Sequence, residues 1–174
     1  MENAFIYDCY NVFKHEERVR GIVSKIADEL QMVDEKIILM EAASVHDIGK
    51  DFISPNVLFR RGGLSKAEWY VISKHIEIGY LRLKELGFDE VICQLCYFHH
   101  GMYNDKYSYD LDITPLPIVK ELYPVLMAAD IYDAVTSPRV YHRSISGDTA
   151  LSILRGNSEI PSFVIDAMSV LNTI

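Results

Sequence analysis

Cysteine, glycine and proline are all scarce in this chain, and it has no long hydrophobic run. Three cysteines among 174 residues are too few for a disulfide framework, which favours a reducing compartment. Nine glycines and six prolines are fewer than average, which argues against a turn-rich β fold. No segment approaches the roughly 20 apolar residues of a membrane-spanning helix, and Met1-Glu2-Asn3 lacks the layout of a signal peptide. We therefore expect a helical, cytoplasmic protein without membrane contact.

Basic residues are also few, and acidic residues outnumber them. The chain has 17 lysines and arginines against 25 acidic residues, a formal charge of −8. Non-specific binding to nucleic acid depends on an excess of positive charge, so we expect no duplex nucleic acid as a partner. A nucleotide ligand remains compatible with this balance, because a metal ion or a local basic cluster can meet its phosphates. The charge says nothing about the oligomeric state.

The spacing of apolar residues predicts an all-α bundle. Hydrophobic residues make up 49% of the chain, far above the disordered class, and we see no linker, so residues 1–174 are predicted to form one domain. Asp34 is expected to cap the second helix and Gly49 to end it, while Ser65 and Glu68 form a capping-box pattern. Residues 101–115 show no period and are predicted to be a loop. The predicted helices cover about 4–30, 34–48, 65–86, 89–100, 116–136, 148–155 and 160–171.

Polar residues of the types that bind metals fall on the apolar stripes of five predicted helices. Any one buried histidine is most simply a hydrogen-bonded core residue. Burying several imidazoles and a carboxylate together costs folding free energy unless they share hydrogen-bond partners or a metal ion. The sequence therefore predicts a shared metal site. Its candidate ligands are His15, His46, His75, His99 and Asp130, together with the immediate neighbours Asp47 and His100.

The number and adjacency of these residues favour two metal ions over one. Neighbours on a helix point about 100° apart, so His46-Asp47 and His99-His100 can approach a cluster from different directions. A carboxylate lying between two cations can bridge them. Seven candidates also exceed the three or four protein ligands of a usual catalytic zinc. We expect two divalent ions, iron or manganese first, with zinc and nickel compatible with the same imidazole and carboxylate ligands.

The segment His46-Asp47-Ile48-Gly49-Lys50 resembles the signature of the HD superfamily of metal-dependent phosphohydrolases. Further blocks in the same order resemble its HD-GYP branch, which includes phosphodiesterases of cyclic di-GMP. The resemblance covers about residues 7–170 and implies an all-α bundle with a metal centre in its middle. The blocks are His15 to Val19, Ile53 to Leu58, Leu64 to Trp69, His75 to Gly79, His99-His100 and Ala129 to Arg139.

The resemblance also implies roles for these residues. One ion would be bound by His15, His46, Asp47 and Asp130, and Asp47 would bridge to a second ion bound by His75, His99 and His100. Members with three ions add a glutamate where this chain has Asn11, so a third ion is not expected. Asp47 and Lys50 are the expected catalytic residues. The expected contacts to the substrate phosphates are Lys50, Arg139 and Arg143, although His142 stands where the family has its second arginine.

The loop after the histidine pair departs from the family. The family reads His-His-Glu followed by Gly-Tyr-Pro, whereas this chain reads His99-His100-Gly101-Met102-Tyr103 and has no proline before Pro115. Phosphoester chemistry is therefore better supported than any one substrate. We predict a metal-dependent phosphohydrolase or phosphodiesterase acting on a nucleotide or cyclic dinucleotide, with slow or absent turnover of cyclic di-GMP. The alternative is a metal-containing module that senses a nucleotide without cleaving it.

Other features stay open between a chemical and a structural role. Cys93 and Cys96 form a CxxC pair that fits core packing better than redox or zinc chemistry. Lys50 is alternatively a helix-end cation, Arg139 a surface residue and His142 a solvent-exposed one. Asp133 is expected either to orient a metal ligand, or to have a helix-surface role or an ion pair. Three loop tyrosines are expected either to stack on a base or to pack the loop: Tyr103, Tyr107 and Tyr109.

Overall fold

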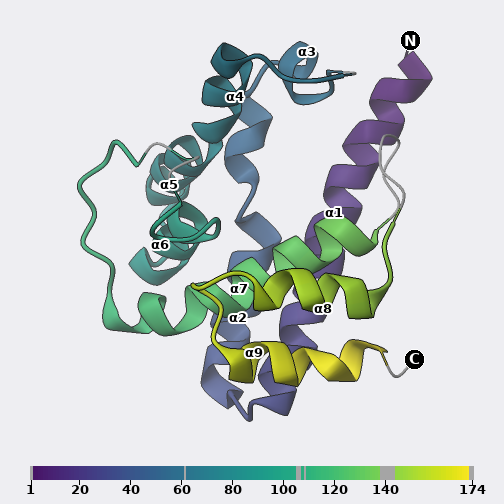
Figure 1. Cartoon of the computed structure of the whole chain (residues 1–174). Coiled ribbons are helices and arrows are strands. Elements are labelled where there is room, and N and C mark those ends of the chain that lie inside the picture. The colour runs from purple at the N-terminus through teal and green to yellow at the C-terminus, as the bar shows by residue number, and fades with distance from the viewer. Residues whose placement is uncertain (1, 61, 105–106, 108, 138–143, 173–174) are drawn as a thin grey trace.

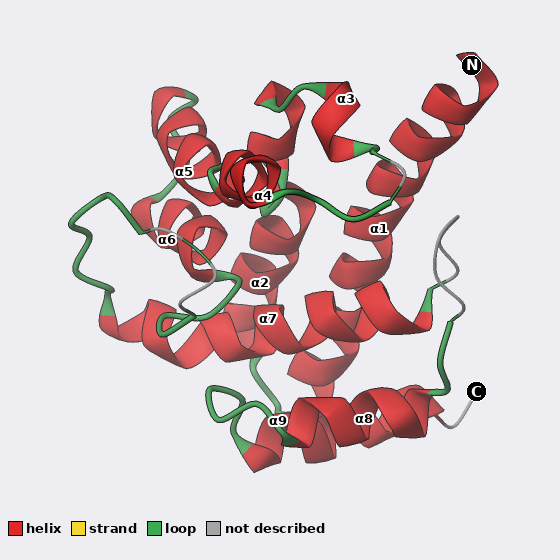
Figure 2. Ribbon diagram, turned by 45° about the horizontal axis from the view of Figure 1, so that its top comes forward, coloured by secondary structure: helices red, strands yellow, loops and turns green. Residues whose placement is uncertain are grey.

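A computed structural model describes residues 2–60, 62–104, 107, 109–137 and 144–172. Within these ranges the chain is helical and contains no strand (Figures 1 and 2), so the predicted all-α class is confirmed. None of the described helices is long and apolar enough to cross a membrane. The elements are α1 (Glu2–Glu29), α2 (Val33–Val45), the 3₁₀-helix η1 (Ile48–Phe52), α3 (Pro55–Leu58), α4 (Lys66–Ser73), α5 (His75–Glu85), α6 (Glu90–Phe98), α7 (Pro117–Thr136), α8 (Gly147–Arg155), α9 (Ser162–Ala167) and the 3₁₀-helix η2 (Met168–Asn172).

The helices surround one hydrophobic core. Helix α1 packs against α2 and α7, and α6 packs against α2, α5 and α7. Helices α8 and α9 lie at one end of the molecule, and α3 and α4 lie at the other (Figure 1). Leu39, Leu95 and Leu126, from α2, α6 and α7, are fully buried where these helices meet. This arrangement brings the middle of α1 and α7 close to the ends of α2 and α6.

Two helix starts follow the sequence pattern closely. The Ser65 hydroxyl accepts a hydrogen bond from the Glu68 amide at 3.3 Å, and the Glu68 carboxylate accepts one from the Ser65 amide at 2.9 Å. This is the predicted capping box. At the start of α6, the Asp89 carboxylate accepts a hydrogen bond from the Val91 amide at 2.8 Å, so this helix also begins where the sequence places it.

Three predicted boundaries are wrong. Helix α2 begins at Val33, so Asp34 lies in its first turn and is not its cap. The same helix ends at Val45 rather than near residue 48, and the chain continues into η1. The helix predicted over 65–86 is two helices, α4 and α5, that meet at Lys74. The apolar spacing continues across the end of α2 and across the break at Lys74. Tertiary packing, and not this spacing, therefore sets these two boundaries.

Gly49 does not end a helix; it lies inside η1 and lets η1 pack against α5. A Cβ atom placed on Gly49 would lie 1.9 Å from the backbone oxygen of His75 and 2.7 Å from the backbone nitrogen of Gly79. Real Cβ atoms do not approach backbone atoms so closely. Glycine is therefore required here by the close approach of two backbones that carry candidate metal ligands.

Substituting Gly49 by alanine is expected to destabilise the fold by about 3 kcal/mol, near the upper end of the cost of overpacking. The methyl group would collide with backbone atoms that cannot rotate away. Gly21→Ala is the matched control, because Gly21 lies exposed in α1 with nothing within 4 Å of its added Cβ, and it should stabilise by about 1 kcal/mol. Urea denaturation measures both, and equal midpoints for the two variants would contradict the packing role of Gly49.

Candidate metal centre

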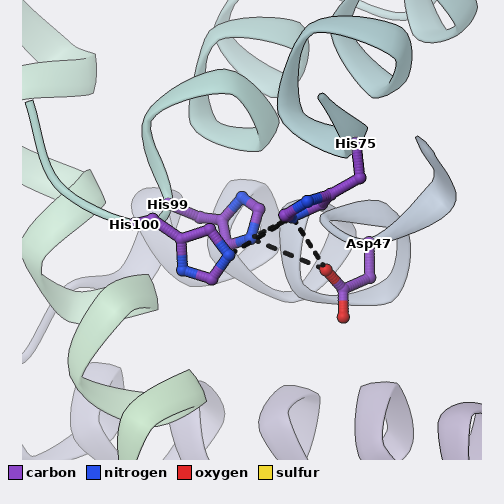
Figure 3. Close-up of side chains that lie close together, drawn as sticks. All are labelled: Asp47, His75, His99 and His100. Atoms are coloured by element: carbon purple, nitrogen blue, oxygen red, sulfur yellow. Dashed lines mark hydrogen bonds and ion pairs between the residues drawn. The ribbon is translucent and has the colours of Figure 1, made fainter. Parts of the chain in front are cut away.

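The fold brings together all seven residues that the sequence singled out as candidate ligands. They come from the middle of α1, the turn after α2, the first residue of α5, the turn after α6 and the middle of α7. His100 is half-buried and the other six are buried. Figure 3 shows three of the imidazole rings and the Asp47 carboxylate pointing toward one another. The seven are His15, His46, Asp47, His75, His99, His100 and Asp130.

Three of the histidines are oriented by the same local contact. The Nδ1 atoms of His46, His75 and His99 lie 2.9, 2.7 and 2.6 Å from the backbone oxygen three residues earlier. Each of the three follows the last turn of a helix, where carbonyl groups lack a partner within the helix. A carbonyl can only accept, so Nδ1 carries the proton. This leaves the Nε2 lone pair of each ring free to face the cluster.

His15 is oriented differently, because it lies within α1 where the backbone oxygens are used by the helix. Its Nδ1 atom lies 2.6 Å from Oδ2 of Asp133. Arg18 donates two hydrogen bonds to the same carboxylate, at 2.6 and 3.0 Å, and Ser137 donates one at 2.7 Å. Asp133 thus contacts a candidate ligand and also forms an ion pair with Arg18. Because the carboxylate is buried, the helix-surface role is wrong.

Asp47 lies between two groups of imidazoles. Its Oδ1 atom is 3.4 Å from Nε2 of His75 and 3.6 Å from Nε2 of His99. Its Oδ2 atom is 3.7 Å from Nε2 of His46 and 3.9 Å from Nε2 of His15. The two oxygens of one carboxylate therefore face the two groups. The group that Oδ1 faces is called the His75 group (Asp47, His75, His99 and His100). The group that Oδ2 faces is called the His15 group (His15, His46, Asp47 and Asp130), so Asp47 belongs to both.

The donor atoms fit a divalent metal ion. Nε2 of His46 and Oδ1 of Asp47 are buried without a hydrogen-bond partner among the described residues, a costly state for polar atoms. Nε2 of His75 also lies 3.4 Å from Nε2 of His99 and 3.2 Å from Nε2 of His100. Nitrogen lone pairs that converge in this way repel one another unless a proton or a cation lies between them. Imidazole and carboxylate donors without a thiolate suit manganese, iron, nickel or zinc.

Burial keeps two of the imidazoles neutral and ready to bind a metal ion. It lowers the pKa of His46 to about 4 and that of His75 to about 3. Burial also works to lower the pKa of His15, but hydrogen bonds to Asp130 and Asp133 outweigh it and raise the pKa to about 9. In the metal-free protein His15 is thus an imidazolium at neutral pH, held between two carboxylates.

Metal affinity is therefore expected to increase with pH between about 7 and 9. An ion that takes Nε2 of His15 must displace a proton whose pKa is about 9, so each unit of pH below that value weakens binding by up to about tenfold. Above that pH the proton is already lost and the affinity levels off. Competition with a chromophoric chelator across this range measures the effect. His15→Ala should bind more weakly with a flatter pH dependence, and a flat profile in the unmodified protein would contradict the assignment.

Asp133→Asn is expected to weaken metal binding by about 10- to 100-fold, the usual effect of losing a carboxylate behind a metal-binding histidine. The variant removes the negative charge that holds His15 in place and leaves Arg18 without its charged partner. Asp166→Asn on the exposed side of α9 is the control and should bind metal normally. Equal dissociation constants for the two variants would mean that Asp133 is only a structural residue.

The remaining sequence candidates are placed as follows. The Lys50 ammonium forms an ion pair with Oδ2 of Asp47, so it lies at the cluster. Both Cys93 and Cys96 are buried, and Cys96 Sγ lies 3.1 Å from the His46 backbone oxygen, in keeping with core packing. The sequence reasoning missed Glu16, whose pKa is raised to about 7 by burial and by the charge of Asp47. Two expected phosphate contacts, Arg139 and Arg143, lie outside the described residues, and so does His142, which was expected to be solvent-exposed.

Comparison with known families and proteins agrees with this geometry. The HD domain family matches residues 12–135. The cyclic di-GMP phosphodiesterase response regulator RpfG of Xanthomonas campestris is 32% identical over 145 residues, which cover 79% of this chain and 37% of that protein. The 3'3'-cGAMP-specific phosphodiesterase 3 of Vibrio cholerae is 31% identical over 144 residues, which cover 82% of this chain and 31% of that protein. The chain thus spans about a third of the length of these relatives.

Solved structures share the fold at low sequence identity. The HD domain of the phosphodiesterase PgpH of L. monocytogenes superposes with a TM-score of 0.66 at 17% identity, covering 92% of this chain and 91% of that one. The same domain in complex with cyclic-di-AMP gives a TM-score of 0.64 at 16% identity, covering 92% of this chain and 89% of that one. The likeness extends over nearly the whole of both chains.

Proposed function

The chain belongs to the HD domain family, and from that premise we propose that it is a metal-dependent phosphodiesterase acting on a nucleotide or cyclic dinucleotide. The observation that carries the proposal is the buried cluster of imidazoles around Asp47. Two polar atoms in it lack a hydrogen-bond partner within the part of the chain that the structure describes, and a lysine lies beside it. Two of the relatives are named for cleaving cyclic di-GMP and 3'3'-cGAMP, which supports this class of substrate. We treat residues 1–174 as a single domain of this kind.

We propose that the site holds two divalent ions, iron or manganese, with zinc or nickel compatible with the same ligands. The His15 group would hold one ion and the His75 group the other, with Asp47 bridging. The placement of Asp47 supports this, because Oδ1 faces His75 and Oδ2 faces His46. Ions held there would activate a water molecule and bind phosphate oxygens.

The protein side chains around the ions would orient the ligands and neutralise charge. Asp133, held by Arg18, keeps the Nε2 atom of His15 turned toward the cluster. The Lys50 ammonium, next to Asp47, lies where it can neutralise charge that develops on the phosphoryl group. Arg139 and Arg143 remain proposed phosphate contacts.

A substrate screen with metal-loaded protein tests the proposal. Cyclic di-GMP, 3'3'-cGAMP, cyclic di-AMP, mononucleotides and methyl p-nitrophenyl phosphate would each be incubated and analysed for products. We expect cleavage of at least one ester, abolished by a chelator, with cyclic di-GMP cleaved slowly because the loop after His100 differs from the family. Binding of a cyclic dinucleotide without cleavage of any ester would instead identify a metal-containing sensor and overturn the proposal.

A further inference from the structure

The residue after the histidine pair makes close contact with a side chain from far along the sequence. Gly101 has a φ of +99°, a conformation that favours glycine. A Cβ atom there would lie 2.5 Å from Oε1 of Glu159. The Glu159 carboxylate accepts hydrogen bonds from the backbone amides of Met102 at 2.6 Å and Tyr103 at 3.3 Å. Glu159 lies in the connection between α8 and α9, beyond the residues that the HD domain family matches.

Glu159 is itself held in place. The Tyr123 hydroxyl of α7 donates a hydrogen bond to Oε2 of Glu159 at 3.2 Å. Burial and the charge of Glu159 raise the pKa of Tyr123 to about 12, so this hydroxyl keeps its proton. The backbone amide of Glu159 donates to Oδ1 of Asn157 at 2.9 Å. The carboxylate therefore joins the bundle to the first residues of the loop that follows His100.

A chain of contacts leads from this point to the metal ligands. The Asn104 side-chain amide donates to the backbone oxygen of His100 at 2.9 Å, and the Tyr107 backbone amide donates to the backbone oxygen of Asn104 at 3.0 Å. The Tyr107 ring stacks on the His100 ring, with centroids 4.2 Å apart and an interplanar angle of 16°. Trp69 is a second aromatic neighbour of Tyr107, with ring centroids 6.0 Å apart and the rings tilted by 59°. Tyr107 thus contacts both a candidate metal ligand and a partly exposed indole.

The other two loop tyrosines do not share this position. The Tyr109 hydroxyl donates to the backbone oxygen of Gly101, and its ring packs on Tyr97 and Phe98. Tyr103 is 81% exposed. Of the three tyrosines that the sequence singled out, Tyr107 is thus the one beside the metal centre, and with Trp69 it forms an aromatic wall at the edge of the His75 group.

We propose that Tyr107 and Trp69 form the subsite for a nucleobase next to the phosphate on the metal ions, and that Glu159 is the positioning residue that holds this subsite in place. The proposal rests on the proposed function for the substrate class. Aromatic side chains bind bases of any sequence by stacking. Glu159 acts at a distance, because it fixes residues 101–103 and thereby the start of the segment that carries Tyr107.

Kinetics of four variants test the proposal: Glu159→Ala, Glu159→Gln, Tyr107→Ala and the neighbouring control Ser158→Ala. For the nucleotide that the screen identifies, we expect Glu159→Ala and Tyr107→Ala to raise KM about tenfold, a typical loss for one stacked base, with kcat nearly unchanged. The fall in kcat/KM should be larger for this nucleotide than for methyl p-nitrophenyl phosphate, which has no base, and the Ser158→Ala control should leave both rates unchanged. Glu159→Gln should restore a normal KM, since its amide oxygen still accepts from Met102. Unchanged KM in Tyr107→Ala would overturn the subsite.

Hydrogen exchange tests the anchoring role without relying on catalysis. The amides of Met102 and Tyr103 should exchange at least tenfold faster in Glu159→Ala than in the unmodified protein, and at the normal rate in Tyr107→Ala and Ser158→Ala. Unchanged exchange in Glu159→Ala would overturn the role of Glu159. If no ester is cleaved by any variant, the proposed function fails by itself. The subsite is then tested by the dissociation constant for cyclic di-GMP. Tyr107→Ala should raise this constant about tenfold, and an unchanged constant would overturn the subsite.

Discussion

Replacing Asp47 by alanine is expected to remove both metal ions from the protein. Burial works to raise the pKa of Asp47, but the positive charge of Lys50 and the neighbouring imidazoles lower it well below its usual value. The side chain is therefore a carboxylate at neutral pH. Because its two oxygens face the two groups of histidines, no other single side chain should matter to both ions. Elemental analysis of protein loaded with manganese or iron and then desalted measures the loss.

Two further variants separate bridging from a general loss of structure. Asp51→Ala removes an exposed carboxylate of η1, the 3₁₀-helix that follows Asp47, and should keep both ions. His100→Ala removes a proposed ligand of the His75 group alone and should leave the other ion bound. If Asp47→Ala retained two ions per chain, the bridging role would be wrong.

Replacing Lys50 by alanine should leave the metal content unchanged and reduce kcat by about 100-fold or more, the usual loss when a group that stabilises developing charge is removed. A protonated lysine cannot ligate a metal ion, yet Lys50 forms an ion pair with the carboxylate at the centre of the cluster. Its charge is thus placed to act on a phosphate held there. Steady-state rates of the metal-loaded variant with methyl p-nitrophenyl phosphate give the measurement.

The competing interpretation of Lys50 is a cation that stabilises the end of η1. That role predicts a lower free energy of unfolding with normal turnover, so urea denaturation and kinetics together distinguish the two. Lys120→Ala, on an exposed position of α7, is the control for removing one surface charge. Normal turnover by Lys50→Ala would return Lys50 to the helix-end role.

The sequence predicts the cluster well because burying histidines among apolar residues leaves a visible pattern. At helical spacing, His46 follows one leucine and two alanines, and His99 follows an isoleucine, a leucine and a cysteine. The structure buries both histidines completely. The all-α class follows from the same periodicity. These signals are local, and they depend on residues within two turns of one another.

Features that depend on distant contacts leave no such pattern. The break at Lys74 lies within a continuous apolar spacing. Next to it, Gly49 packs closely on the backbone of His75, a contact from another part of the chain that the local spacing does not contain. Arg18 and Asp133 are 115 residues apart, so their pairing cannot be read from either neighbourhood. The contact of Glu159 with Met102 is of the same kind, since neither residue belongs to a motif.

The number of metal ions in the unmodified protein tests the central claim most directly. Protein loaded with manganese or iron, desalted and analysed for metal and protein together, should contain two ions per chain. Removal of the ions by a chelator should abolish cleavage of methyl p-nitrophenyl phosphate, and adding them back should restore it. One ion or none per chain, or cleavage that persists in the chelated protein, would contradict the account of an Asp47-bridged site.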